Sequence, residues 1–477
     1  MTITVNSTVT RSGVYRQVYA STLAALRTLR GEIAILSGYY AAGDGGGGTF
    51  VWSNTTALDD GGVTVNFTAG STAAGWRRVI EGDQLNILWF GAQEGETADV
   101  TKEARNHAAI TAALASVAAT VSGFAERRAV YVPPGVWWMS AAISIATGLG
   151  QRIVGAGRST TQIKNRYGTT FSFVSTSLTS HFALDNLQVV ASAGRAFEAI
   201  GAGTLGLFQA TFRYVTITGT STAHELIYIE DRLASSLFDN CIFTHADTSV
   251  VPAIYLKSAN INDNTWRSCT AVRCGQYFFR IENTSDTTWC INNRFEDIVS
   301  SGTMPGLIEG LGVKNLVLDG CNADSGTITG DYISIGPSTN VVPLASQDNI
   351  ICNSHRRAGT ITGHDIALDP TTLHTRIDNC HAQGGTAFKL SLGDTPVTMT
   401  GVRSDNITII GDANLTWLRQ GALVVDGKAS LLSGEGDPNT VQDGAKGSLY
   451  TDRTDAKLYL KTTDAGFLTG WVEMAAV

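Results

Sequence analysis

Short segments that alternate apolar and polar residues carry the side chains best suited to chemistry in this sequence. Seven of them lie between positions 227 and 391 and read IYIE, IYLK, FRIE, LIE, ISIG, IALD and FKLS. In a β-strand successive side chains point to opposite faces, so the apolar residues face a core and the polar residues face outward. Alignment of the segments gives a first outward column of Glu230, Lys257, Glu282, Glu309, Gly336, Asp369 and Ser391, and beside it a second column of Tyr228, Tyr255, Arg280, Ser334, Ala367 and Lys389.

The carboxylates of the first column have the spacing that glycoside hydrolysis requires. If the segments stack as parallel strands ~4.8 Å apart, Glu282 and Glu309 are one strand spacing apart, and Glu230 and Glu282 are two spacings, roughly 9–10 Å, apart. Glycosidases use two carboxyl groups at ~5–5.5 Å when one is the nucleophile and at ~6.5–9.5 Å when a water fits between them. When two carboxyl groups lie close together, the pKa of one of them rises, and a general acid needs such a raised pKa. We therefore predict Glu282, Glu309 and Glu230 as catalytic residues.

The same two columns contain residues that could bind a glycan. Tyr228 and Tyr255 can stack on sugar rings, whereas Lys257 and Arg280 can hold acidic substituents. We add Asp369 as a further substrate-binding residue. Two other interpretations stay open, because the outward residues of any solenoid strand are polar: a binding or subunit-contact face without chemistry, and an ordinary solvated face.

The remaining polar residues have simpler explanations. Four aspartates precede turn residues: Asp185, Asp239, Asp319 and Asp378. Asp and Asn in such turns usually bond their own backbone. The segments HADTSVV, with His245 and Asp247, and SANINDNTWRS, with Asp263 and Trp266, are predicted as exposed loops and are weaker site candidates. The eight histidines lack metal-ligand spacing and no serine lies in a GxSxG context, so we expect neither a metal nor a cofactor.

The elements that must position these residues repeat along the chain. Nine turn-rich segments align on a column of mostly small or apolar residues: Leu187, Val215, Cys241, Cys269, Asp297, Cys321, Cys352, Cys380 and Val402. Successive members are 28, 26, 28, 28, 24, 31, 28 and 22 residues apart. A period of this length predicts a solenoid, and the segments have strand character. Five of the seven cysteines occupy the column, so we interpret them as small core side chains rather than as disulfides or metal ligands.

The composition limits the range of functions. Charged residues make up 16% of the chain and the net charge is −8, and Lys and Arg form no cluster of the kind that binds phosphates. The N-terminal segment lacks the apolar stretch of a signal peptide, and no stretch reaches the ~18–20 apolar residues of a membrane helix. We therefore expect a protein that is made in the cytoplasm, does not bind nucleic acid and does not insert into a membrane.

Three regions differ in their sequence pattern. Residues 1–82 form a leader with a short helical segment and strands broken by glycine turns. Residues 83–410 carry the repeat, and an amphipathic helix at about 101–117 would cover the open end of its core. Residues 411–477 break the repeat and read as a small β module around LYLKTT and GWVEM, which would close the far end.

Several segments resemble those of a known superfamily. AGDGGGGTFVWSNTT with DDGGVTV, NILWFGAQEGETADVT before a helix, and VYVPPGVWWMS resemble the entry region of bacteriophage tailspikes of the pectate-lyase-like, right-handed parallel β-helix superfamily. The stretch DGAKGSLYTDRTDAKLYLKTTDAGFLTGWVEM is similar to a small module that ends many phage tail fibre proteins. These motifs flank the repeat on both sides.

The resemblance implies an all-β fold: a single-stranded right-handed parallel β-helix with an N-terminal capping helix and small terminal β modules. It also implies a homotrimer in a virion, attached through its N-terminal region to a tail or baseplate protein and directed at a bacterial surface polysaccharide. The expected function is recognition and depolymerisation of capsule or lipopolysaccharide. Hydrolysis catalysed by carboxylates is the favoured reaction, and β-elimination by a Lys or Arg base is the lesser possibility. A glycan-binding tail fibre without catalysis remains an alternative. A further alternative is a cellular polysaccharide lyase or hydrolase. The absent signal peptide and the tail-like modules argue against it.

Overall fold

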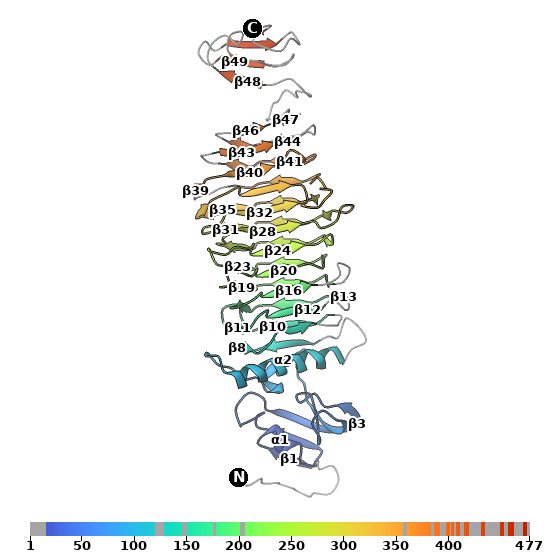
Figure 1. Ribbon diagram of the computed structural model, residues 1–477. Helices are drawn as coiled ribbons and strands as arrows, with labels where there is room; N and C mark the ends of the chain where they lie inside the picture. The colour runs from blue at the N-terminus through green and yellow to red at the C-terminus, as the bar shows by residue number, and fades with distance from the viewer. Residues whose placement is uncertain are drawn as a thin grey trace.

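Parallel strands stacked in three long columns form most of the molecule (Figure 1). The computed structural model describes residues 16–119, 128–145, 150–174, 178–200, 206–355, 360–382, 386–391, 397–400, 402–404, 407–410, 415–418, 431–434, 449–452, 457–461 and 471–474. The expected right-handed parallel β-helix is confirmed. In each turn of the helix, or rung, between residues 129 and 325 the chain passes through one strand of each sheet in succession, and in later rungs it passes through the first and third sheets.

We name the three sheets B, C and D, in the order in which the chain passes through them. Sheet B contains β6 Gln84–Asn86, β7 Ala129–Val132, β10 Arg152–Gly155, β14 Ala183–Asp185, β18 Thr211–Arg213, β22 Leu237–Asp239, β26 Thr265–Arg267, β30 Arg294–Glu296, β34 Val317–Asp319, β38 Ile350–Cys352, β41 Arg376–Asp378, β44 Val397–Thr400 and β47 Leu415–Leu418. Sheet C contains β8 Gly135–Met139, β11 Thr161–Asn165, β15 Gln188–Ala191, β19 Thr216–Gly219, β23 Ile242–Thr244, β27 Thr270–Val272, β31 Val299–Ser301 and β35 Asn322–Ser325.

Sheet D carries the residues that the sequence singled out for chemistry. It contains β9 Ile143–Ile145, β12 Phe171–Val174, β16 Phe197–Ile200, β20 Ile227–Ile229, β24 Ile254–Lys257, β28 Tyr277–Glu282, β32 Gly306–Leu311, β37 Ile333–Gly336, β40 His364–Leu368, β43 Thr386–Ser391 and β46 Ile407–Ile410. Shorter strands lie between the main sheets: β13 Leu178–Ser180, β17 Gly206–Phe208, β21 Arg232–Ala234, β25 Ile261–Asn262, β29 Cys290–Ile291, β33 Val313–Lys314, β36 Thr327–Ile328, β39 Thr360–Ile361, β42 His381–Ala382 and β45 Arg403–Ser404.

The core consists of apolar side chains that repeat from rung to rung. On sheet B the aromatic rings stack directly, with centroids 4.5 Å apart for Phe212 and Phe238 and 3.6 Å apart for Phe238 and Trp266. Trp266, which the sequence analysis assigned to an exposed loop, is therefore a core residue. His245, assigned to another exposed loop, is also buried, whereas its neighbour Asp247 is exposed. Trp266 lies at the inward position of β26, and His245 directly follows β23, and polar neighbours in the sequence hid the burial of both side chains.

Turns that follow the strands of sheet B use a backbone conformation that few residues tolerate. Seven of these turns contain a residue other than glycine with φ between 46 and 57°: Asn186, Tyr214, Asn240, Ser268, Asp297, Asn353 and Asn379. Asn and Asp adopt this left-handed conformation more readily than most residues, because their side chains bond locally. This requirement explains the Asx-rich turns of the repeat.

The turn residues correct the predicted repeat column at two positions. Asp297 is itself a turn residue, so the buried Ile298 takes the column position. Asn353 is the next such residue, so Ser354 takes the position predicted for Cys352. Cys352 instead pairs in register with Asp319 and is half-buried, whereas the other six cysteines are buried and none is in a disulfide. At Ser354 the alignment failed because the column residue is polar, whereas at Ile298 the column residue is apolar and the segment was aligned one residue out of register.

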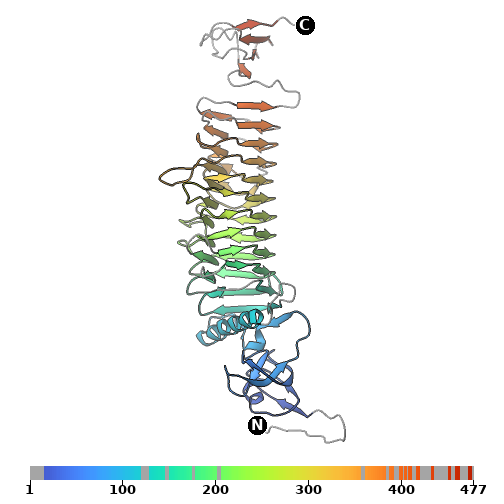
Figure 2. The ribbon, with the colours of Figure 1, turned by 90° about the vertical axis from the view of Figure 1, so that its right-hand side faces the viewer.

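Helix α2, Val100–Ala119, covers the first rung of the solenoid (Figure 2). Ala109, Ile110, Ala113, Leu114 and Val117 recur at helical spacing and join the solenoid core. A short 3-10 helix, η1 Ile87–Phe90, precedes it and also contributes to this core. In the part of the chain that the structure describes, no helix combines the length and apolarity of a membrane-crossing segment.

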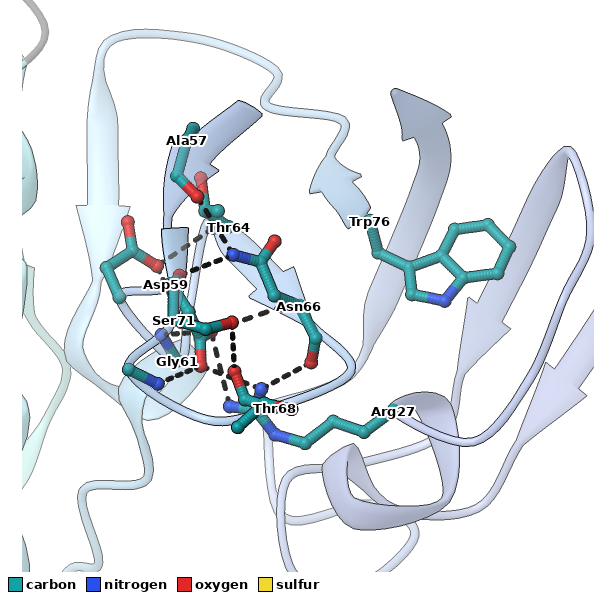
Figure 3. Close-up of polar contacts among 12 residues, drawn as sticks. Arg27, Ala57, Asp59, Gly61, Thr64, Asn66, Thr68, Ser71 and Trp76 are labelled. Carbon is teal, nitrogen blue, oxygen red and sulfur yellow. Dashed lines mark hydrogen bonds and ion pairs between the residues drawn. The ribbon is translucent and has the colours of Figure 1, made fainter. Parts of the chain in front are cut away.

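A separate five-stranded sheet precedes the solenoid. Its strands and one short helix are β1 Gln17–Ala20, α1 Leu23–Leu26, β2 Ile33–Leu36, β3 Gly48–Leu58, β4 Thr64–Asn66 and β5 Thr72–Arg78. A buried ion pair anchors its loops, with Arg27 Nη1 2.7 Å from Asp59 Oδ2 (Figure 3). Asn66 donates its side-chain amide to the carbonyls of Ala57 and Ser71. These hydrogen bonds fix the turn between β4 and β5.

A small sheet also follows the solenoid along the chain. It contains β48 Leu431–Gly434, β49 Leu449–Asp452, β50 Lys457–Lys461 and β51 Trp471–Glu473. Tyr450, Tyr459 and Trp471 form its buried aromatic cluster. β50 includes residues 458–461 of the LYLKTT segment and β51 includes residues 471–473 of the GWVEM segment, in which the sequence predicted a β module.

Candidate functional site

The outward face of sheet D brings most of the predicted residues together. Strands β20, β24, β28 and β32 lie one above another (Figure 1), and their apolar residues are buried in the core. Tyr228 pairs in register with Tyr255, Tyr255 with Arg280, and Arg280 with Glu309. These four outward side chains therefore form one continuous column along the solenoid.

The register corrects the predicted position of Glu309. Lys257 pairs with Glu282 as expected, but Glu282 pairs with Leu311, and Glu309 lies in the Arg280 column. The sequence alignment was two residues out because Gly310 occupies the inward position opposite Ile281, where an apolar side chain was expected. Glu282 and Glu309 still lie on neighbouring strands, diagonally across the sheet.

Glu282 has acceptor contacts at both carboxylate oxygens. The hydroxyl of Tyr255 donates to Oε2 and the hydroxyl of Thr339 donates to Oε1. Arg280 Nη2 lies 3.2 Å from Oε2, and the side chain of Glu282 is only 9% exposed. Burial alone would raise the pKa of Glu282, but these hydroxyls and the charges of Arg280 and Lys257 outweigh it and lower that pKa.

Glu309 contacts the same guanidinium but has fewer partners. Arg280 Nε lies 3.3 Å from Glu309 Oε2, and the two atoms are in charge contact without hydrogen-bond geometry. Burial raises the pKa of Glu309, and the nearby charge of Glu282 raises it further against the opposing charge of Arg280. The two carboxyl groups thus have pKa values that are moved in opposite directions, an arrangement that separates an acid from a base.

Thr339 was not predicted from the sequence, because it lies in an irregular loop after β37. Two loops meet beside Glu282: Asn340 Nδ2 donates to the Ser285 carbonyl at 2.7 Å, and Trp289 Nε1 donates to the Ala345 carbonyl at 3.1 Å. Loop 337–345 is therefore tied to loop 283–289, and together they border the C-terminal end of β28. The strand repeat contains no signal for such an insertion.

The two predicted tyrosines have different surroundings. Their ring centroids are 5.7 Å apart at an interplanar angle of 67°. Tyr255 donates its hydroxyl to Glu282, whereas the ring of Tyr228 lies 4.2 Å from the Arg195 guanidinium. Burial and the charge of Glu230 raise the pKa of Tyr228 to about 12, so its hydroxyl stays protonated near neutral pH.

Two other predicted residues lie further from the carboxylate pair. Glu230 follows Ile229, whose partner is Leu256, so Glu230 is two strands from Glu282. Asp369 follows Leu368, three strands from Glu282, and its Oδ1 accepts from the backbone and hydroxyl of Thr371. The structure therefore brings Glu230 near the tyrosines and places Asp369 outside the cluster.

A group that sequence analysis missed extends the cluster toward β16. Arg195 lies 3.2 Å from Glu198 and 2.9 Å from Glu225. Glu198 pairs in register with Tyr228, so it continues the outward column. Its segment, FEAI, has the same alternation as the seven aligned segments and could have been added to them.

The aspartate column of sheet B is bound chiefly by side chains. Asp185 lies 2.7 Å from Arg152, and Asp239 lies 3.1 Å from Arg267. Asp319 accepts from the amide of Asn353 at 2.9 Å. Within the described residues, no three His, Cys, Asp or Glu side chains are grouped to hold a metal ion.

Residues 19–81 match the model of the phage tail protein small four-stranded β-sheet domain. No curated protein matches the sequence. Among solved structures, the chain is similar to the tailspike protein gp49 of Acinetobacter baumannii bacteriophage Fri1, a capsular polysaccharide depolymerase, with a TM-score of 0.52 and 14% identity over 86% of this chain and 76% of that one.

Two further structures are similar in outline. The tailspike of Acinetobacter phage vB_ApiP_P1 has a TM-score of 0.48 and 14% identity, over 86% of this chain and 71% of that one. ORF18 of Geobacillus virus E2 has a TM-score of 0.48 and 13% identity, over 97% of this chain and 100% of that one. Residues 19–81 thus match a phage tail protein domain, and the chain shares the parallel β-helix fold of the gp49 structure.

Proposed function

We propose that the chain is a phage tailspike that binds a bacterial surface polysaccharide on sheet D and hydrolyses its glycosidic bonds. The observation that carries this proposal is the pair Glu282 and Glu309, held by one arginine with their pKa values moved apart. The polysaccharide depolymerase with a similar fold supports the choice of substrate class.

Each carboxyl group has a distinct role in this reaction. Glu309, with the raised pKa, donates a proton to the glycosidic oxygen as the sugar–oxygen bond breaks. Glu282, which is held ionised, stabilises the positive charge on the sugar or accepts a proton from the attacking water. Arg280 holds both groups in place. As a guanidinium that stays protonated, it cannot serve as the base that β-elimination needs, which favours hydrolysis.

Incubation of the purified protein with capsule and lipopolysaccharide from candidate hosts tests the proposal. Hydrolysis produces new reducing ends without the ultraviolet absorbance of an unsaturated sugar. An absorbing product would indicate a lyase. Binding to the host glycan with the polymer left intact would indicate a glycan-binding fibre without catalysis and would reject the enzymatic part.

We also propose a homotrimer, whose contact face is sheet C. The outward residues of five successive strands there are half-buried and carry no charge: Gln188, Val190, Thr216, Thr218, Ile242, Thr244, Thr270, Val272, Val299 and Ser301. An uncharged strand face suits contact with further copies, since charged residues are depleted from interface cores. Ile242→Asp should convert a species of three chain masses into monomer in light scattering. A wild-type monomer would reject the proposal.

The phage tail protein domain supports a location in the virion tail. We propose that region 1–82 attaches to a tail or baseplate protein, that 83–410 is the glycan-binding solenoid and that 411–477 is a capping, trimerisation or receptor-contact module. The protein would be made in the host cytoplasm. If the first region attaches the spike, virions assembled with only a chain that starts at residue 83 should lack it.

A further inference from the structure

The two arginines of the sheet D face are already engaged by carboxylates of this chain. Arg195 is paired with Glu198 and Glu225, and Arg280 is paired with Glu282 and Glu309. An acidic substituent of a glycan could bind either arginine only by displacing one of these carboxylates. The displaced group would stay close by without its cationic partner, which is costly when it is as buried as Glu225 or Glu282.

The face also carries an excess of negative charge. Three cations, Arg195, Lys257 and Arg280, lie among six carboxyl groups: Glu198, Glu225, Glu230, Glu282, Glu309 and Asp331. Negative charges therefore outnumber positive ones even when Glu309 is protonated. Asp331 is partly exposed and is 2.7 Å from His364 Nδ1 at the β40 end of the face. A polyanionic chain lying along these strands would therefore meet a repulsive field.

Carboxylates of this face also act on the partly buried phenol groups. Burial raises the pKa of Tyr277 to about 12, and Asp331 and Glu309 contribute in the same direction. Burial and the charge of Glu282 also raise the pKa of Tyr255. The neutral groups of the face, such as the ring of Tyr228, remain suited to sugar rings and hydroxyls.

We infer that the glycan bound on sheet D lacks acidic substituents: it is uncharged or carries amino groups. The inference rests on the proposed function and narrows its substrate class. The internal ion pairs act as a specificity filter, because they leave hydrogen-bonding and ring-stacking groups available while they occupy the arginines that would otherwise bind carboxylates or phosphates.

An array of bacterial capsular and O-antigen polysaccharides of known structure tests the inference with the full-length protein. The expected ligands are neutral or amino-sugar polymers, and binding should vary little with salt for neutral ones. Binding confined to acidic polymers would overturn the inference while leaving glycan recognition intact. Absence of binding to every polymer would overturn the proposed function itself.

A matched pair of variants tests the filter directly. Glu225→Gln frees Arg195 from one partner on sheet D, and Asp239→Asn frees Arg267 in the same way on sheet B. Glu225→Gln should give a several-fold gain in affinity for an acidic homologue of the bound glycan, whereas Asp239→Asn should give none. Equal behaviour of the two variants would show that the arginine pairs on sheet D do not select against acidic glycans.

Discussion

Sheets B and D both carry arginine–carboxylate pairs, but the two sets differ in their surroundings. On sheet B, Arg267 pairs in register with Asp239, and its side chain is 47% exposed. On sheet D, Arg280 pairs in register with Glu309 in the same way, is 31% exposed and also contacts Glu282, which is 9% exposed. A cross-strand ion pair alone follows from in-register stacking and does not mark a site.

The difference arises from residues outside the strand repeat. The Thr339 loop and the hydroxyl of Tyr255 surround Glu282 on sheet D, whereas Asp239, whose side chain is 13% exposed, lies beside Arg267 and Asn240. Polar groups that converge on a buried carboxylate fix its orientation and its protonation state. The comparison therefore predicts that equivalent substitutions on the two sheets have unequal effects on activity.

The largest effect is expected for the two carboxylates. Glu282→Gln and Glu309→Gln should each lower the rate of polysaccharide cleavage ~10²–10⁴-fold, the usual contribution of a positioned acid or base. Asp239→Asn removes a carboxylate that is also paired with an arginine, but on sheet B, and should leave the cleavage rate unchanged. New reducing ends per unit time give the measurement.

Thermal unfolding separates this loss from misfolding. Both glutamine variants should unfold cooperatively and close to the wild-type temperature, since glutamine keeps the size and most contacts of glutamate. Full activity in both would remove the catalytic assignment of sheet D, and loss of activity in Asp239→Asn as well would remove the distinction between the sheets.

A smaller effect is expected for the arginines. Lys at position 280 keeps a charge but cannot span Glu282 and Glu309 with a planar fork. Arg280→Lys should therefore lower activity about tenfold, the loss of one charge-assisted contact of ~1.5 kcal/mol. Arg267→Lys on sheet B should have no effect on activity. A rate of Arg280→Lys equal to the wild type would mean that simple charge suffices between the carboxylates.

The sequence was sufficient for the fold and for much of this face, because core and outward positions alternate strictly. The columns that contain Tyr228, Tyr255 and Arg280 follow directly from that alternation. The position of Glu309 could not be predicted in this way, because Gly310 occupies an inward position and has no apolar side chain from which the register could be recognised. Thr339 could not be predicted either, because its contact with Glu282 depends on a loop without periodicity.

The loop contact should be visible in the pH dependence of cleavage. Glu282 has a lowered pKa and acts ionised, so activity falls as pH drops through that pKa. Thr339→Val removes one hydroxyl donor, should raise the pKa of Glu282 and should move the acid limb to higher pH. Thr339→Ser keeps the hydroxyl and should restore the wild-type profile. The alkaline limb, set by the raised pKa of Glu309, should stay in place. Identical acid limbs in all three proteins would show that the loop does not tune Glu282.

The smallest effect is expected for stability on sheet B. Asp239→Asn removes a partly exposed ion pair and should lower the free energy of unfolding by less than ~1 kcal/mol at neutral pH. The hydrogen bond from Arg267 lowers the pKa of Asp239, so its stabilising contribution is present above the unfolded-state pKa and is lost as pH falls through the folded-state pKa. Denaturant unfolding of variant and wild type should therefore differ slightly at pH 7 and coincide in acid. A larger loss of unfolding free energy at pH 7 would mean that the arginine–aspartate pairs of sheet B stabilise the stacking of the rungs. Both faces would then be under structural constraint, and only the activity of the sheet D variants would separate them.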